Sequence, residues 1–177
     1  MPPVLTGAHV KLRSPVISDA NARFSWGTVP EIAIMFGVSA ADIKPLTLEK
    51  SQQWARNLAT HPNAWIIEHG GALIGEIRLD RLDMQDRRAS MAIAIYDPSS
   101  LGRGLGTEAI KLVLAHAFGT MALHRIGIRV LAYNARAIRA YQKCGFVIEG
   151  RERDTAYVNG TWHDDIIMGL LEHEYEV

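Results

Sequence analysis

A glycine-rich turn that leads directly into a helix is the feature that most constrains this sequence. Residues 101–106 are Leu-Gly-Arg-Gly-Leu-Gly, and apolar residues then recur at helical spacing over residues 110–118. Such a turn presents backbone N–H groups and the positive end of a helix dipole to one point. Glycine also lacks the Cβ atom that would hold a phosphate away. The loop is therefore an expected anion-binding site.

Three interpretations compete for this loop. A P-loop requires Lys-Ser or Lys-Thr after the last glycine, and neither follows here. A dinucleotide-binding fold requires G-x-G-x-x-G and an acidic residue about 20 positions later. Here the glycines are spaced G-x-G-x-G, and residues 109–148 contain no Asp or Glu. A turn that only redirects the chain remains open on the loop alone.

The rest of the chain predicts an α/β fold. Alternating apolar residues between Gly-Gly and short polar turns indicate an antiparallel meander in the middle of the chain. Capping residues and helical spacing indicate the helices. We expect strands at 9–13, 64–69, 72–82, 89–96 and 125–133 and two more around a turn at Asn159-Gly160, broken helices at 18–37, and helices at 47–62, after the loop, and from Asn134 to a stop at Gly145. No repeat or linker divides these elements, so we expect a single domain over residues 1–177.

Composition excludes several classes of protein. The 177 residues include 19 Lys and Arg against 19 Asp and Glu, which does not favour nucleic-acid binding through phosphates. No apolar leader and no run of about 18 uncharged apolar residues occurs, so we expect neither export nor membrane insertion. The single cysteine, Cys144, fits a reducing, cytoplasmic location. The histidines form no H-x-x-x-H pair, so no metal is expected.

A second motif, Asn-Ala-Arg-Ala-Ile-Arg-Ala-Tyr-Gln-Lys-Cys-Gly-Phe at residues 134–146, accompanies the loop. Together they resemble the GNAT superfamily of acyl-CoA-dependent N-acetyltransferases. Residues 123–126, 147–154 and 162–174 resemble its branch of ribosomal-protein N-terminal and spermidine acetyltransferases. The resemblance implies an α/β (α+β) fold with a mixed, mostly antiparallel central sheet flanked by helices.

The resemblance also implies that acetyl-CoA is bound as the acyl donor, with no metal. In the family, the loop holds the pyrophosphate, and a strand that splays from its neighbour and carries a bulge meets the pantetheine arm. Leu101 stands where the family usually has Gln or Arg. Arg103, Arg139 and Lys143 are candidate phosphate contacts. The implied acetyl-CoA contacts are Ile93, Ala94, Ile95, Leu101, Gly102, Arg103, Gly104, Leu105, Gly106, Thr107, Asn134, Ala137, Tyr141 and Lys143.

Direct acetyl transfer needs a neutral amine, donors for the developing oxyanion, and an acid for the departing thiolate. The resemblance assigns the last role to Tyr141, whose phenol has a reference pKa of about 10, above about 8.5 for a thiol. The alternative for Tyr141 is an aromatic side chain that only packs on the sheet. Cys144 is expected to be a small buried hydrophobe and not a nucleophile.

The sequence offers several candidates for the general base. Many relatives carry a Glu on the strand before the loop, where this chain has Ser90 or Met91. Glu76 on the preceding strand is a candidate catalytic residue, and a solvated strand charge is the alternative. His124 or a chain of water molecules are other routes.

We therefore expect transfer of acetyl to a primary amine: a protein N-terminus first, then a polyamine or another small amine. An N-terminal amine, with a pKa near 8, needs less help than an alkyl amine near 10.4. The competing class is a non-catalytic CoA-binding regulatory domain, because the strand Glu is missing. By resemblance, a homodimer through the last two strands is also expected.

Overall fold

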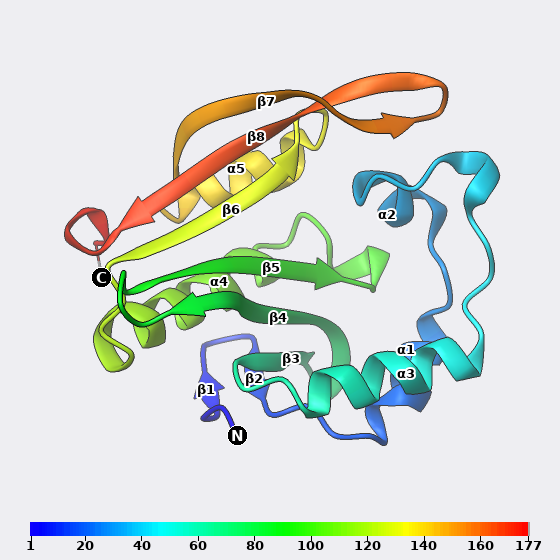
Figure 1. The fold of residues 1–177 in the computed structure, drawn as a ribbon. Helices are drawn as coiled ribbons and strands as arrows, with labels where there is room; N and C mark the ends of the chain where they lie inside the picture. The colour runs from blue at the N-terminus through cyan, green and yellow to red at the C-terminus, as the bar shows by residue number, and fades with distance from the viewer. Residues whose placement is uncertain (177) are drawn as a thin grey trace.

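The computed structural model describes residues 1–176, and its centre is a sheet of eight strands in the order β1-β2-β3-β4-β5-β6-β8-β7 (Figure 1). Strands β5 and β6 are parallel, and the other neighbours are antiparallel. The predicted mixed, mostly antiparallel sheet is therefore confirmed. The strands are β1 (Leu5–Thr6), β2 (Lys11–Arg13), β3 (Ala64–His69), β4 (Ala72–Asp83), β5 (Arg88–Ile95), β6 (Arg125–Leu131), β7 (Val147–Val158) and β8 (Thr161–Leu171).

Helices flank both faces of the sheet (Figure 1). Helices α4 (Leu105–Ala115) and α5 (Ala135–Lys143) pack on one face and enclose the main hydrophobic core. Helices α1 (Asp19–Trp26) and α3 (Leu48–Ala59) cover a smaller apolar cluster on the other face. Helix α2 (Pro30–Met35) lies beside the ends of β5 and β6. Short 3₁₀ turns occur at Ala40–Asp42, Pro98–Ser100 and Glu172–Glu174.

Several element boundaries differ from the sequence prediction. Helix α4 ends at Ala115 and continues as a π-helical turn at His116–Thr120, although Ala117 and Phe118 stay on the predicted buried face. The predicted strand over residues 125–133 stops at Leu131, and the last strand stops at Leu171 before a 3₁₀ turn. Strand β1 was not predicted, because two residues are too few to show alternation.

Two predicted chain reversals are confirmed. Asn159 and Gly160 have φ values of 51° and 80°, as a tight two-residue hairpin turn requires. Helix α5 is followed by Gly145 with φ of 94°. Its predicted N-cap is also present, because the side chain of Asn134 accepts a hydrogen bond from the Ala137 N–H.

A partly buried ion-pair network connects the N-terminal helix to the sheet. The Arg13 guanidinium donates from Nη2 to Asp19 Oδ1 at 2.6 Å and from Nε to Glu68 Oε1 at 2.6 Å. The hydrogen bond with Asp19 raises the pKa of Arg13 above its ordinary value. These contacts join β2, the start of α1 and β3, and so fix the layer that faces away from α4 and α5.

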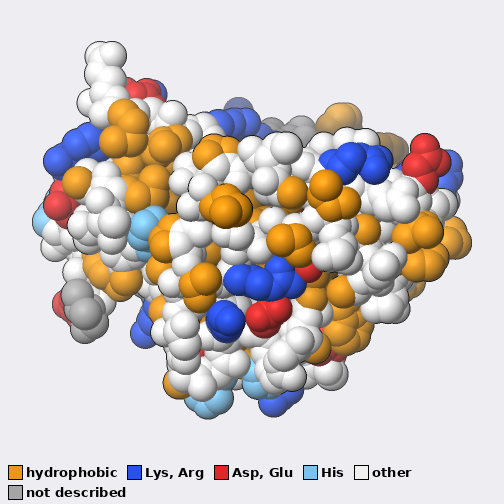
Figure 2. Space-filling view, turned by 90° about the horizontal axis from the view of Figure 1, so that it is seen from below, with side chains coloured by type: hydrophobic (Ala, Val, Ile, Leu, Met, Phe, Trp, Pro, Cys, Tyr) orange, Lys and Arg blue, Asp and Glu red, His pale blue; other side chains and the backbone are white. Residues whose placement is uncertain are grey.

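The charged side chains are distributed over the surface in mixed groups. In the view from the β1 side, Lys and Arg side chains occur in separate groups, some of them next to acidic ones (Figure 2). None of the helices within residues 1–176 combines the length and apolar content that crossing a bilayer demands.

The close approach of β4 to β5 generates a first prediction. A Cβ atom at Gly75 would lie 2.1 Å from the Ala94 carbonyl oxygen and 3.1 Å from Ile95 Cα. Both contacts are with backbone, so Gly75→Ala forces the two strands apart. We expect the free energy of unfolding in urea to fall by about 1–3 kcal/mol.

Gly119→Ala is the matched control, because a Cβ atom there meets no heavy atom within 4 Å. It should not lower stability, since Ala in place of Gly within the helical turn at His116–Thr120 gains up to about 1 kcal/mol. Equal stability of the Gly75 and Gly119 variants would contradict the close contact.

Candidate active site

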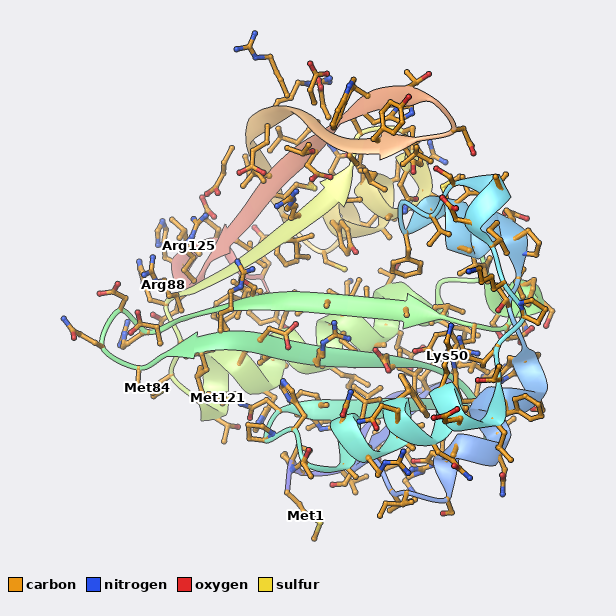
Figure 3. The ribbon with its side chains drawn as sticks, turned by 45° about the vertical axis from the view of Figure 1, so that its right-hand side comes forward. Met1, Lys50, Met84, Arg88, Met121 and Arg125 are labelled. Carbon is orange, nitrogen blue, oxygen red and sulfur yellow. The ribbon has the colours of Figure 1, made fainter. Side chains whose placement is uncertain are left out.

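The site is built around a gap in the middle of the sheet, between residues 91–95 of β5 and residues 128–131 of β6. The two strands pair only at one end, through Arg88↔Arg125, Ala89↔Ile126 and Ser90↔Gly127. Arg88 and Arg125 mark this closed end, and β5 and β6 diverge away from it (Figure 3). Beyond it, β5 stays paired with β4, and β6 stays paired with β8. The facing edges of β5 and β6 are therefore free along the gap.

The free edge of β5 offers backbone donors to the gap. The Tyr96 N–H donates to the Ile74 carbonyl oxygen on β4 at 2.7 Å. Because N–H groups alternate in direction along a strand, the Ala94 N–H points toward β4 and those of Ile93 and Ile95 point toward the gap. The predicted bulge here is wrong, since the β4–β5 register is continuous from Gly75↔Ile95 to Asp80↔Ser90. Divergence of the strands alone exposes these donors.

Asp97 shapes the turn that leads from β5 into the glycine loop. Its buried carboxylate accepts hydrogen bonds from Ser99 N at 2.9 Å and from Ser100 Oγ at 2.5 Å. Burial opposes the charge, but the hydrogen bonds from Ser100 and Ser99 outweigh it and hold the pKa of Asp97 below its usual range. The sequence analysis missed this residue, although Asp-Pro-Ser-Ser is a recognisable capping pattern.

The glycine loop leaves a row of backbone N–H groups without acceptors. Gly102 and Gly104 have φ values of 72° and 84°, in the left-handed region that glycine adopts readily. The first bond of α4 runs from the Glu108 N–H to the Gly104 carbonyl oxygen at 2.9 Å. Within residues 1–176, no acceptor receives the N–H groups of residues 102–107. This end of α4 therefore favours an anion.

A cavity of about 620 Å³ joins the loop to the gap. It reaches both faces of the sheet, because residues of α4 and α5 line one part and residues of α2 line another. The predicted contacts that line it are Ile93, Ile95, Leu101, Gly102, Gly104, Gly106, Thr107, Asn134, Ala137, Tyr141 and Lys143. Ala94, Arg103 and Leu105 are not among the lining residues, and Leu105 is instead part of the main core.

Tyr141 reaches the cavity from α5. Its side chain is buried and belongs to the main core, so the packing interpretation is also satisfied. Its hydroxyl has no hydrogen-bond partner in the part of the chain that the structure describes. Burial raises the pKa of Tyr141 to about 12, so the phenol keeps its proton at all ordinary pH values. The free hydroxyl can donate to a group bound in the cavity.

Cys144 is held as a neutral thiol. Its Sγ lies 3.7 Å from the Thr107 carbonyl oxygen, to which it donates. Burial raises the pKa of Cys144 to about 11, so little thiolate exists near pH 7. This environment agrees with the expected small buried hydrophobe.

Basic side chains outnumber acidic ones around the cavity. Its lining includes Arg129, Arg136, Arg139 and Lys143, against the single carboxylate of Asp165. Arg136 Nη1 also lies 3.3 Å from Glu31 Oε1. Within residues 1–176, His, Cys, Asp and Glu side chains form no group of three or more that could hold a metal ion.

Helix α2 is attached to the connection between β6 and α5. The Tyr133 hydroxyl donates to the Ile34 carbonyl oxygen at 2.6 Å, and Asn134 Nδ2 donates to the Met35 carbonyl oxygen at 3.4 Å. These bonds hold α2 against the open end of the gap. The sequence analysis missed Ile32, Met35, Phe36, Arg129 and Asp165 as cavity residues, because their spacing carries no signal of these distant contacts.

Glu76 lies outside the cavity lining. It is opposite Ala94 in the β4–β5 register and faces α3. Its Oε2 accepts from Trp54 Nε1 at 2.5 Å and its Oε1 from Arg78 Nη1 at 2.6 Å. The alternative of a solvated strand charge is wrong, since only 5% of Glu76 is exposed. His124 is exposed near the closed end of the gap, 3.7 Å from Glu172.

Comparison with known proteins decides what kind of site this is. The family model described as "Acetyltransferase (GNAT) domain" matches residues 9–147. The chain belongs to this GNAT family. The divergent parallel strands, the glycine loop and the cavity between them are thus features of a GNAT domain.

Three relatives illustrate the range of this GNAT family. The chain is 32% identical over 111 residues to spermidine N(1)-acetyltransferase of Escherichia coli K12, which covers 63% of this chain and 59% of that protein. It is 33% identical over 108 residues to the putative ribosomal N-acetyltransferase YdaF of Bacillus subtilis, covering 61% and 58%. A crystal structure of spermidine N-acetyltransferase from Vibrio cholerae with CoA and spermine has a TM-score of 0.79 at 22% identity, covering 96% and 99%. The matches to the two curated relatives thus span less than two thirds of their length.

The geometry around Glu76 generates a second prediction. Glu76→Gln removes a charge that Arg78 and Trp54 share in a buried setting, and it places an NH₂ group where both partners donate. We expect a loss of about 2–3 kcal/mol in the free energy of unfolding.

Asp80→Asn is the matched control, because Asp80 also binds Arg78, with Oδ2 3.0 Å from Nε, but is partly exposed. Its cost should stay below about 1 kcal/mol. A Glu76 variant as stable as the Asp80 variant would show that the pairing of Glu76 adds little.

Proposed function

We propose that this chain is an acetyl-CoA-dependent N-acetyltransferase that transfers acetyl directly to a primary amine. The observation that carries the proposal is the row of free N–H groups at residues 102–107, which opens into the same cavity as the gap between β5 and β6. A diphosphate fits the first feature and an extended thioester arm fits the second. GNAT membership makes acetyl-CoA the molecule that carries both groups.

The donor is proposed to enter with its diphosphate on the loop amides. Arg139 and Lys143 line the cavity on the same side and add positive charge for the phosphates. Arg103, which is exposed, remains a predicted phosphate contact. The pantetheine arm would then follow the gap, where the Ile93 and Ile95 N–H groups have no strand partner. These donors would bind the thioester carbonyl as it becomes an oxyanion.

In the transfer step, the amine nitrogen attacks the thioester carbonyl carbon and the C–S bond breaks. Full proton transfer from a phenol with a pKa of about 12 to a thiolate near 8.5 would be uphill by roughly 5 kcal/mol. We therefore propose that Tyr141 donates a hydrogen bond to the departing sulfur. The proton released by the amine passes to solvent, and the thiol proton is taken up from it.

The acceptor is proposed to be a protein N-terminus or a small primary amine. An α-amine with a pKa near 8 has a useful neutral fraction at pH 7–8 without a dedicated base. Glu76 remains a predicted base, but both of its oxygens already accept hydrogen bonds, which favours a structural role. Turnover of Glu76→Gln at saturating substrates decides between the two.

Three further expectations stay predictions. One domain over the whole chain accords with the continuous eight-stranded sheet. A cytoplasmic location accords with one cysteine held as a buried thiol. A homodimer through β7 and β8 accords with β7 at the sheet edge and with exposed apolar side chains at Val147, Ile148, Tyr157 and Trp162.

The test of the proposed function is thiol release from acetyl-CoA in the presence of an amine panel of N-terminal peptides, spermidine and monoamines. We expect amine-dependent release with at least one class. Binding of acetyl-CoA without release for any amine would instead identify a regulatory CoA-binding domain. Absence of acetyl-CoA binding in calorimetry would overturn the proposal.

Gly104→Val tests the role of the glycine loop, with acetyl-CoA affinity measured by calorimetry. The substitution places a branched side chain at φ of 84° in the cavity wall. We expect acetyl-CoA affinity to fall at least about 100-fold, since the loop amides can no longer surround a phosphate. Gly70→Val is the control: φ is 57° there, in the β3–β4 turn away from the cavity, so backbone strain is similar. Equal loss of affinity in both variants would remove the loop from the site.

Tyr141→Phe provides a further prediction. Loss of a hydrogen bond to a developing charge should lower kcat about 10- to 100-fold while the Kd for CoA is unchanged. For the wild type, kcat/KM should rise with pH as the amine loses its proton. Because the pKa of Tyr141 is about 12, no falling limb should occur below about pH 11. A fall centred near pH 10, or unchanged kcat in the variant, would contradict this role.

A further inference from the structure

The part of the cavity next to α2 has an apolar wall. Ile32 and Met35 line it from α2, Phe36 lines it from the residue that follows α2, and Leu131 lines it from β6. A Cβ atom at Gly37, two residues after the end of α2, would lie 3.4 Å from Leu131 Cδ1, so this segment lies against β6. Leu131 is opposite Asp165 in the β6–β8 register, so both side chains belong to the same face of the sheet. This face is opposite the one covered by α4 and α5.

Asp165 is the carboxylate of this compartment, and only one of its oxygens is used by the protein. Oδ2 accepts from Arg129 Nε at 2.5 Å and from Thr155 Oγ1 at 2.8 Å. Oδ1 has no hydrogen-bond partner among residues 1–176, although Asp165 is 95% buried and lines the cavity. Among residues 1–176 no buried side-chain oxygen lacks a hydrogen-bond partner, so the unpartnered Oδ1 is accessible from the cavity, where a bound ammonium group would supply a charge-assisted donor.

The surrounding charge limits how many positive groups a ligand can carry. The other charged residues of the cavity lining are basic, namely Arg129, Arg136, Arg139 and Lys143. They suit the phosphates of the donor. Arg129, which shares a face of the sheet with Asp165, would repel the additional ammonium groups of a polyamine, for which Asp165 offers a single partner.

We propose that the acceptor is a primary amine with one positive charge on an apolar body, whose ammonium group binds Asp165 Oδ1 while the body lies against α2. This inference rests on the proposed N-acetyltransferase function and narrows its substrate class. Asp165 is then a specificity-determining residue, and Arg129 and Thr155 orient its carboxylate. Spermidine, for which the Escherichia coli relative is named, is a polyamine and carries several ammonium groups. The acceptor proposed for this chain carries one.

The test is calorimetry on the protein saturated with CoA, which carries no acetyl group, so that binding occurs without turnover. The probes are phenylalaninamide, its neutral N-acetylated form, and spermidine. We expect phenylalaninamide to bind about 10- to 100-fold more tightly than the N-acetylated form, the range for a hydrogen bond to a charged group. It should also bind more tightly than spermidine.

Asp165→Asn should abolish the preference for the charged probe and leave CoA affinity unchanged. Glu152→Gln is the matched control, because Glu152 Oε2 lies 3.5 Å from Arg129 Nη1 but Glu152 does not line the cavity. It should keep the preference. A role of Asp165 in folding alone would lower stability without changing the ratio of the two affinities.

Three results would overturn the inference: equal affinity for the charged and neutral probes, tighter binding of spermidine, or a preference that survives in Asp165→Asn. The first two need only the wild-type protein, so a variant that fails to fold does not prevent a decision. Failure of the proposed function is recognised separately, by absent acetyl-CoA binding or absent thiol release. The probe ratio can then still be measured on the protein without CoA.

Discussion

The loss of pairing between β5 and β6 beyond Ser90 is the constraint on which the site depends. Unpaired N–H groups in the middle of a sheet are unfavourable unless a ligand or water binds them. The sheet tolerates the opening because each strand keeps its outer neighbour, β4 on one side and β8 on the other. The close contact of Gly75 with the Ala94 carbonyl shows how tightly β5 is held there. The gap is thus bordered by two strands that are each paired on their outer side, and free donors line its edge.

Electrostatics separates the cavity into two compartments, although the chain has equal numbers of acidic and basic residues. On the side of α4 and α5, the N–H groups of residues 102–107 and the basic side chains of α5 create a region that favours anions. On the side of α2, the buried carboxylate of Asp165 favours a cation. An anionic donor and a cationic acceptor would therefore approach the gap from opposite faces of the sheet.

The features that the sequence predicted best are those determined by residues close together along the chain. The cap at Asn134, the turn at Asn159-Gly160 and the glycine loop depend on local backbone preferences, and all three are present. Periodicity indicates which face of a strand is apolar, but it does not say what covers the polar face. The burial of Glu76 depends on Trp54, which a helix brings from 22 positions away. The attachment of α2 depends on Tyr133 bonding 99 positions back along the chain. Such contacts leave no local pattern.

The side chain of Asn134 serves two elements at once. Its Oδ1 caps α5 and its Nδ2 binds the carbonyl of Met35 at the end of α2. One planar amide thus links α5, the helix that carries Tyr141, to α2, which lines the cavity on the opposite face of the sheet. Rotation of this amide would break one or both of these hydrogen bonds, so the position of α2 and the start of α5 are tied to a single side-chain torsion.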